Sequence, residues 1–160
     1  TVISVMDTEK IRELVDDAVG KNPELFLITL NFLPNNSIFV EIDGDSGVPL
    51  NECIRISREI EHNLDRESED FSLEVTSPDV TQPLRLKRQY KKNINRKLKV
   101  KTESGSSYEG VLTQVEEDQI TLEWKAREPK PIGKGKRTVV KNKVVSFDNI
   151  VEAKVKLLFN

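Results

Sequence analysis

The stretch NECIRISREIEHNLD (residues 51–65) and the stretch FSLEVT (residues 71–76) after it decide the fold of the first half of the chain. In the first stretch the apolar residues recur at helical spacing, so one face of the helix is apolar. That face carries Cys53, Ile56, Ile60 and Leu64. Asn51 is the expected N-cap, because its side chain accepts hydrogen bonds from the free amides of a first turn. The second stretch is rich in strand formers and is closed by Ser77-Pro78, so a strand follows the helix.

A second helix is expected near the start of the chain, over Asp7–Gly20. Its apolar residues also fall on one face, and either Asp7 or Thr8 can cap its first turn. Gly20 suits position C′, just beyond the helix, where glycine adopts the left-handed conformation at little cost.

Two strands are expected between the helices. Leu25–Phe32 is rich in strand formers, Ser37–Asp43 alternates apolar with polar residues, and the turn Pro34-Asn35-Asn36 separates them. The order α-β-β-α-β predicts an α/β domain over residues 1–83, KH-like or ferredoxin-like, with helices on a small sheet.

The second half, residues 84–160, has a different pattern. Short strand-forming runs follow one another with tight turns between them, which is typical of a small β-barrel of the Sm-like, SH3-like or OB type. The runs are Leu98–Thr102, Tyr108–Val115, Gln119–Lys125, Thr138–Val145 and Ile150–Phe159. Residues 84–97 are expected to form a basic linker, and residues 126–137, broken by prolines and glycines, a long basic loop. The whole chain is therefore expected to be α+β.

The net charge of the chain conceals a division. The 160 residues contain 25 Lys+Arg and 27 Asp+Glu, a net charge of −2. Residues 1–83 hold 6 Lys+Arg and 18 Asp+Glu, whereas residues 84–160 hold 19 Lys+Arg and 9 Asp+Glu, so the halves carry −12 and +10. Such asymmetry points to nucleic acid or to a charged protein partner.

Composition excludes most catalytic and metal sites. One Cys and one His leave no disulfide, no zinc site rich in cysteine and no His-based triad, and one Cys suits a reducing, cytoplasmic compartment. Gly44-Asp45-Ser46-Gly47 resembles the surroundings of a serine protease nucleophile, but the only histidine, His62, lies downstream on a helix, and a turn explains the motif better. No apolar run approaches the length of a membrane span. We expect a binding protein with no catalytic residues, no metal, no cofactor and no small-molecule substrate.

The basic second half is the expected phosphate-binding surface, because lysine and arginine neutralise nucleic-acid backbones. The candidate contacts are Arg85, Lys87, Arg88, Lys91, Lys92, Arg96, Lys97, Lys99, Lys134, Lys136, Arg137, Lys141 and Lys143. Tyr90, Tyr108 and Trp124 are candidates for base stacking and equally for the core.

Several motifs resemble those of the RimP family of ribosome maturation factors, over about Thr8 to Phe159. They are the helix stretch with Cys53 and Ser57-Arg58, the strand ending Val75-Thr76-Ser77-Pro78, the dipeptide Pro83-Leu84, and Tyr108-Glu109-Gly110-Val111-Leu112. Asp79 and Gln82 stand where the family usually has Gly and Arg. We expect Asp79 to tolerate the left-handed conformation of a turn glycine.

The resemblance implies a non-catalytic assembly factor that binds the free or immature small (30S) ribosomal subunit. It implies 16S rRNA and the small-subunit ribosomal protein numbered twelve as partners, and an Sm-like barrel as the second domain. It gives Ser77, Pro78, Pro83 and Gly110 structural roles. The charge division suggests that the acidic helix faces, with Glu52, Glu59 and Asp65, contact the ribosomal protein.

Two other functions remain open from the sequence. An Sm-like general RNA-binding regulator would bind RNA without a ribosomal partner and would form rings, whereas the fused first domain favours a monomer. A protein–protein adaptor would use its lysines for solubility alone, and its interaction would depend little on salt.

Overall fold

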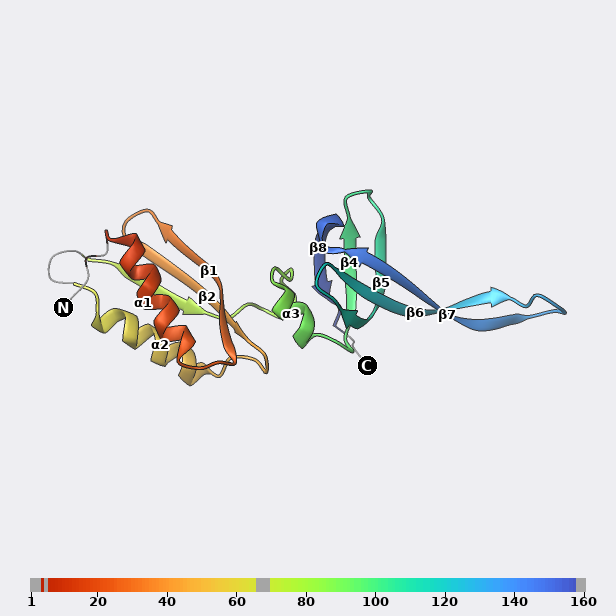
Figure 1. Ribbon diagram of the computed structural model, residues 1–160, viewed down its shortest axis with the longest axis horizontal. Coiled ribbons are helices and arrows are strands. Elements are labelled where there is room, and N and C mark those ends of the chain that lie inside the picture. Colours follow the sequence, from red (N-terminus) through yellow and green to blue (C-terminus); the bar gives the residue numbers. More distant parts are fainter. Residues whose placement is uncertain (1–3, 5, 66–69, 158–160) are drawn as a thin grey trace. The chain divides into compact units, whose positions relative to one another are not determined.

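The computed structural model describes residue 4, residues 6–65 and residues 70–157. The chain divides into two compact units, Thr1–Asp79 and Val80–Asn160, which are labelled by their elements in Figure 1.

Unit 1 contains two helices and a three-stranded sheet in the predicted order α-β-β-α-β. The elements are α1 (Thr8–Gly20), β1 (Leu25–Leu33), β2 (Ser37–Gly44), α2 (Leu50–His62) and β3 (Ser72–Thr76). The strand order is β1-β2-β3; β1 pairs with β2 antiparallel, and β2 pairs with β3 parallel. The parallel pair is possible because α2 carries the chain back between β2 and β3.

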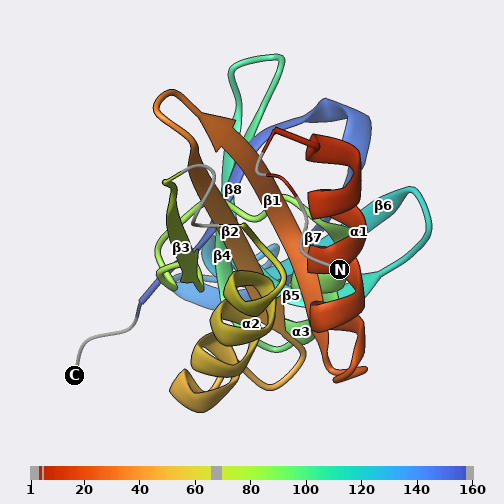
Figure 2. The same ribbon diagram turned by 90° about the vertical axis from the view of Figure 1, so that its left-hand side faces the viewer.

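Both helices cover one face of this sheet, as Figure 2 shows. The apolar faces expected from the periodicity are the ones that pack: Val15 of α1, Ile56 and Ile60 of α2, and Val40 of β2 are all fully buried. Cys53 is only half-buried and packs at the margin of this core.

The helix ends differ in part from the prediction. Asp7 is the N-cap of α1, and its carboxylate accepts a hydrogen bond from the Lys10 amide at 3.2 Å. The predicted cap of α2 is wrong: Pro49 holds the N-cap position in an extended conformation and Asn51 lies inside the first turn. The C′ prediction for Gly20 is also wrong, because the helix includes Gly20 and ends on Lys21 in a right-handed conformation.

The hairpin turn between β1 and β2 follows the prediction. Asn35 and Asn36 both adopt left-handed conformations, with φ of 64° and 54°, which asparagine tolerates better than most residues. Asp79 does not adopt a positive φ, so its tolerance of a left-handed conformation stays a prediction.

Unit 2 contains five antiparallel strands, as predicted. Its elements are α3 (Lys87–Lys92), β4 (Lys97–Thr102), β5 (Ser107–Val115), β6 (Gln119–Pro129), β7 (Lys136–Ser146), the 3₁₀ turn η1 (Phe147–Asn149) and β8 (Ile150–Val155). The strand order is β7-β6-β5-β4-β8. Over the residues described, no pairing between β7 and β8 closes this sheet, so barrel closure stays a prediction. The run expected over Ile150–Phe159 is a strand as far as Val155, and residues 158–160 lie outside the described part.

The two connecting segments of unit 2 both contain regular structure. The basic linker at 84–97 includes helix α3. The long basic loop at 126–137 is wrong in extent: β6 and β7 stay paired as far as Pro129↔Lys136, and only residues 130–135 connect them. The prolines and glycines that led to the prediction of a long loop are therefore confined to the tip of a long hairpin.

The core of unit 2 lies on one face of β4, β5 and β6. Leu98 and Val100 of β4, Leu112 of β5, and Ile120 and Leu122 of β6 are fully buried. They occupy alternate positions, which leaves the intervening lysines of β4 on the opposite face.

Gly110 permits a close approach of β5 to β6. A Cβ atom built at this position would lie 2.9 Å from the carbonyl oxygen of Glu123 and 3.2 Å from its backbone nitrogen. Backbone atoms inside a paired sheet cannot move aside, so this position requires glycine.

We therefore expect Gly110→Ala to destabilise the protein by about 1–3 kcal/mol, since the added methyl overpacks a rigid sheet. Urea unfolding followed by circular dichroism measures the change. Gly20→Ala is the matched control, because a Cβ there meets nothing within 4 Å and its φ is not positive. That variant should be neutral or more stable by up to about 1 kcal/mol. Equal stabilities for the two variants would contradict the role given to Gly110.

Candidate nucleic-acid and protein interfaces

The candidate phosphate contacts fall into three groups on unit 2. The first group is on or beside α3 (Arg85, Lys87, Arg88, Lys91 and Lys92), the second on or beside β4 (Arg96, Lys97 and Lys99), and the third on the β6–β7 hairpin (Lys134, Lys136, Arg137, Lys141 and Lys143). Lys87, Lys91 and Lys99 are exposed, whereas Arg88, Lys92 and Lys97 are half-buried.

The outer face of β4 gathers more lysines than the sequence suggested. Lys97, Lys99 and Lys101 alternate with the buried residues of β4, and β8 lies antiparallel beside it. Lys154 stands directly opposite Lys99, and the Lys156 amide donates to the Lys97 carbonyl at 2.8 Å. Lys154 and Lys156 are not among the candidates named from the sequence; their spacing of two residues in a strand-forming run was the signal available.

Two glutamates partly neutralise this lysine face. Glu109 of β5 pairs with Lys156 at 2.8 Å, and Glu152 of β8 pairs with Lys154 at 3.0 Å. The hydrogen bonds from these lysines lower the pKa of each glutamate, and the charges of neighbouring lysines add to the effect. Five lysines against two glutamates leave an excess of positive charge on an exposed sheet face, which suits a polyanion rather than a single small ligand.

The three aromatic candidates take different positions. Tyr90 is a core residue: it is buried against Phe147 with ring centroids 5.1 Å apart, and burial raises its pKa to about 12. Tyr108 and Trp124 are half-buried, with ring centroids 6.3 Å apart, and both pack against the core. Lys143 places its Nζ 5.6 Å from the centre of the Tyr108 ring. Tyr90 is therefore too buried to stack on a base. Tyr108 and Trp124 contribute mainly to the core.

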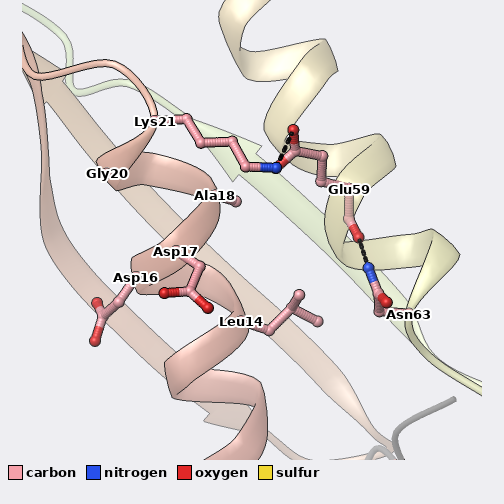
Figure 3. A pocket seen from close by; sticks show the side chains of 8 residues that line it. All are labelled: Leu14, Asp16, Asp17, Ala18, Gly20, Lys21, Glu59 and Asn63. Atoms are coloured by element: carbon pink, nitrogen blue, oxygen red, sulfur yellow. Dashed lines mark hydrogen bonds and ion pairs between the residues drawn. The ribbon is translucent and has the colours of Figure 1, made fainter. Parts of the chain in front are cut away.

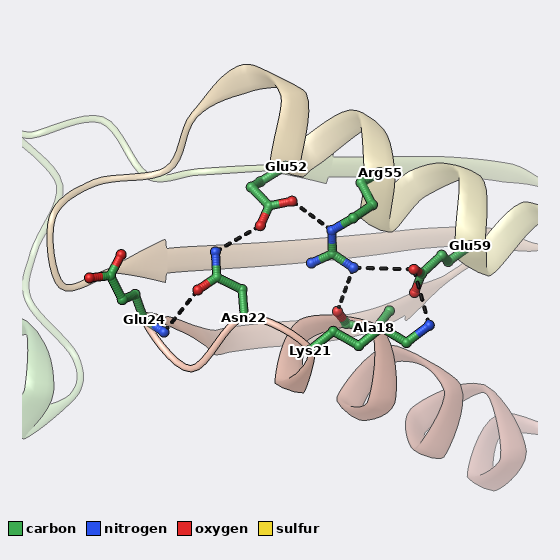
Figure 4. Close-up of polar contacts among 7 residues, drawn as sticks. All are labelled: Ala18, Lys21, Asn22, Glu24, Glu52, Arg55 and Glu59. Atoms are coloured by element: carbon green, nitrogen blue, oxygen red, sulfur yellow. Dashed lines mark hydrogen bonds and ion pairs between the residues drawn. The ribbon is translucent and has the colours of Figure 1, made fainter.

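Two of the three acidic candidates of unit 1, Glu52 and Glu59, are engaged in an ion network between α1 and α2, shown in Figure 4. Glu52 accepts hydrogen bonds from Asn22 Nδ2 at 2.7 Å and from Arg55 Nε at 2.6 Å. The Arg55 guanidinium also donates to Glu59 at 3.2 Å and to the Ala18 carbonyl, at the end of α1, at 3.1 Å. Lys21 completes the network by pairing with Glu59 at 3.1 Å.

This network gives Glu52 and Glu59 a structural role within unit 1. The hydrogen bonds from Arg55 and Asn22 lower the pKa of Glu52, because they stabilise its charged form. Asp65, the third acidic candidate, is half-buried just beyond α2. That these three residues contact a protein partner stays a prediction.

A surface hollow of about 580 Å³ lies between α1 and α2, seen in Figure 3. Asp16 and Asp17 of α1 line it and are exposed, and Lys21 reaches across it to Glu59. Three carboxylates against one ammonium make this face acidic. Asp16 and Asp17, which the sequence analysis did not select, are the more accessible acids here; their place on the polar side of an amphipathic helix was the signal.

The remaining motif residues support the fold. Thr76 Oγ1 donates to the Ser77 carbonyl at 3.3 Å where β3 ends before Pro78. Beyond Pro83, the Leu84 amide donates to the Ala153 carbonyl of β8 at 2.8 Å, which fixes the start of unit 2 to its edge strand. Pro83 and Leu84 also line a cleft of about 480 Å³ with Tyr90 and Phe147.

The described residues hold no group of three or more His, Cys, Asp or Glu side chains arranged to bind a metal. His62 is exposed at the end of α2, and burial together with the charge of Glu52 raises the pKa of the Cys53 thiol, which keeps it protonated. The Gly44–Gly47 segment forms the turn after β2, closed by the Gly47 amide donating to the Gly44 carbonyl at 3.1 Å. Among the helices described, none is both long and apolar enough to cross a membrane.

Comparison with known proteins gives one consistent result. Residues 14–81 match the family model of the RimP N-terminal domain. A protein of Christiangramia forsetii named ribosome maturation factor RimP is 54% identical over 151 residues, covering 94% of this chain and 98% of that protein. The protein of the same name in Flavobacterium psychrophilum is 51% identical over 151 residues, covering 94% and 97%, and the one in Porphyromonas gingivalis is 38% identical over 119 residues, covering 74% and 78%.

The ion network predicts how stability depends on pH. The pKa of Glu52 is lower in the folded state, so its contribution is complete above the ordinary glutamate pKa of about 4.3 and is lost as the pH falls through the folded-state value. Glu52→Gln should cost about 1 kcal/mol at pH 7 and should lose less stability than the wild type between about pH 5 and pH 3.

Urea titrations at a series of pH values measure this difference. Glu13→Gln, an exposed position on the polar side of α1, is the matched control and should follow the wild type. Parallel stability profiles for Glu52→Gln and the wild type would contradict the network's role.

Proposed function

With relatives this similar over nearly its whole length, the chain belongs to the RimP family of ribosome maturation factors, and we propose that it acts in maturation of the small (30S) ribosomal subunit. It binds the free or immature subunit as a monomer, in the cytoplasm, and catalyses no reaction. The family assignment carries this proposal, and the charge division between the units indicates how binding is shared.

Unit 2 is the proposed contact with 16S rRNA. Its net charge is +10, and its lysines occupy the exposed face of β4, the α3 segment and the β6–β7 hairpin. Such contacts to phosphates position a protein on RNA without reading its sequence, which suits a factor that recognises one assembled particle by shape.

Unit 1 is the proposed contact with the small-subunit ribosomal protein numbered twelve. Its net charge of −12 favours a basic partner, and the acids around the α1–α2 hollow supply an accessible acidic surface. Because Glu52 and Glu59 hold the helices together, the exposed Asp16 and Asp17 are the contacts that partner binding can use at least structural cost, and Asp65 remains a candidate beside them.

We also propose that residues 1–83 and 84–160 act as separate domains and that the second is an Sm-like barrel. The strand order β7-β6-β5-β4-β8, with α3 before the first strand, supports this fold. The close approach of β5 to β6 that Gly110 permits is compatible with such a fold, because glycines are used where small sheets curve toward closure.

Sedimentation of a cell extract on a sucrose gradient tests the function. The protein should travel with free small subunits and be absent from assembled ribosomes. Its absence from every ribosomal fraction would overturn the maturation role, and RNA binding in that situation would favour a general RNA-binding regulator.

A charge variant tests whether unit 1 binds the ribosomal protein while unit 2 binds 16S rRNA. Asp16→Asn with Asp17→Asn removes two exposed acids and leaves the network of Figure 4 in place. We expect binding to the isolated ribosomal protein to weaken about three- to tenfold, because exposed charges contribute modestly and through the association rate. Binding to 16S rRNA should be unchanged.

Glu13→Gln with Glu24→Gln, which alters two exposed acids outside the hollow, is the control for net charge and should bind both partners normally. Calorimetry measures protein binding and filter binding measures RNA binding. If Asp16→Asn with Asp17→Asn binds the ribosomal protein normally, the α1–α2 surface is not the contact.

A further inference from the structure

The β6–β7 hairpin continues beyond the sheet to which it belongs. The recorded pairing between β5 and β6 ends at Val111↔Glu123, whereas β6 and β7 remain paired from Gln119↔Ser146 to Pro129↔Lys136. The pairs from Lys125↔Val140 onward therefore form a two-stranded ribbon, drawn in pale blue at its tip in Figure 1. At about 3.4 Å per residue, the ribbon projects roughly 17 Å before its connecting loop.

The ribbon has an ordered backbone. Besides the strand ladder, Arg127 donates across the hairpin to Thr138 Oγ1 at 3.0 Å and to the Lys136 carbonyl at 3.4 Å. The Lys130 amide donates to the Gly135 carbonyl at 3.2 Å and closes the loop, in which Gly133 and Gly135 have positive φ. A ribbon of this kind has little core of its own, so its length is not explained by the stability of unit 2.

Positive charge dominates this segment. Residues 125–143 contain eight Lys and Arg and a single acid, Glu128, which pairs with Lys141. The eight are Lys125, Arg127, Lys130, Lys134, Lys136, Arg137, Lys141 and Lys143, and all are exposed.

The cations are divided equally between the two faces of the hairpin. Residues directly opposite in an antiparallel pair share a face, and alternate residues change face. Arg137, Lys141 and Lys143 therefore lie on the face of Trp124. Lys125, Arg127 and Lys136 lie on the other face, with Val140. A hairpin that docked flat on one surface would need its charges on one face only.

The opposite end of the same ladder is acidic. Glu116, Glu117 and Asp118 form the turn before β6, and Asp148 lies in η1 directly after β7. These two segments meet where the Phe147 amide donates to the Asp118 carbonyl at 3.0 Å. Lys87 of α3 pairs with Glu117 at 3.4 Å and offsets part of this negative charge, so along β6 and β7 a polyanion is attracted most strongly at the tip.

We propose that the β6–β7 hairpin inserts between two phosphate backbones of folded RNA, with three cations directed at each strand. On one face Arg137 of the ribbon acts together with Lys141 and Lys143 at the ribbon's base, and on the other face all three cations belong to the ribbon. The proposal rests on the proposed function in that RNA is taken as the partner of unit 2. A double helix or helix junction supplies two backbones side by side, whereas a single strand would leave the cations of one face unused. The proposal predicts that the two faces contribute about equally.

Two double variants of the full chain separate the faces. Arg137→Gln with Lys143→Gln removes two cations from one face, and Lys125→Gln with Lys136→Gln removes two from the other. Arg127 and Lys141 are left in place because they make bonds within the hairpin. Lys10→Gln with Arg12→Gln removes the same charge from exposed positions on α1 and is the control.

Binding is measured by fluorescence anisotropy at several salt concentrations, with a short RNA hairpin and an unstructured RNA of equal length. We expect the wild type to prefer the hairpin. Each ribbon variant should lose roughly tenfold in affinity for it and should reduce the slope of log K against log salt by about 1–2, as expected for two lost phosphate contacts. The control should match the wild type, and circular dichroism should show all four proteins folded.

Each of the other outcomes would overturn a named part of the proposal. A loss from one face only, or equal binding of the hairpin and the unstructured RNA, would overturn insertion between two strands. Normal binding by both ribbon variants would overturn the ribbon proposal and leave RNA binding by unit 2 standing. Failure of the wild type to bind either RNA would overturn the proposed rRNA contact itself.

Discussion

The close approach of β5 and β6 at Gly110 is the constraint on which unit 2 depends. With no side chain at this position, the backbone of β5 lies against that of Glu123, and the recorded pairing of the two strands ends there. The first part of β6 is consequently held by a strand on either side and buries Ile120 and Leu122. The second part is held by β7 alone. One glycine thus separates a strand into a segment that builds the core and a segment that projects from it.

In unit 1 the partly buried side chain of Arg55 has the comparable role. Arg55 joins a carbonyl of α1 to two glutamates of its own helix, and Lys21 and Asn22 extend these bonds to the residues after α1. Glu52 and Glu59, both on α2, are thereby used to hold the two helices together. The acidity that remains available to a partner therefore lies on Asp16 and Asp17, outside the network.

Periodicity and local chemistry were sufficient to predict the helices and strands of unit 1 and the five strands of unit 2. The order α-β-β-α-β, the cap at Asp7 and the five strands of unit 2 all follow from patterns that span a few residues. The length of the β6–β7 hairpin could not be predicted in this way. Pro129, Gly133 and Gly135 interrupt regular structure at a hairpin tip and in a long loop alike, and only the pairing of residues distant in the sequence distinguishes the two. The lysine face of β4 and the engagement of Glu52 were missed for the same reason: each depends on which residue stands opposite in space.

The exposed flank of β7 has a further consequence. In the described part of the chain β7 pairs only with β6, so one line of its backbone amides and carbonyls lies at the margin of the sheet, beside the exposed Val140 and Val144. Apolar edge strands of this kind invite pairing with another molecule. Lys141 and Lys143 alternate with these valines, and two copies brought edge to edge would place like charges together. The lysines of β7 therefore oppose edge-to-edge pairing of two copies.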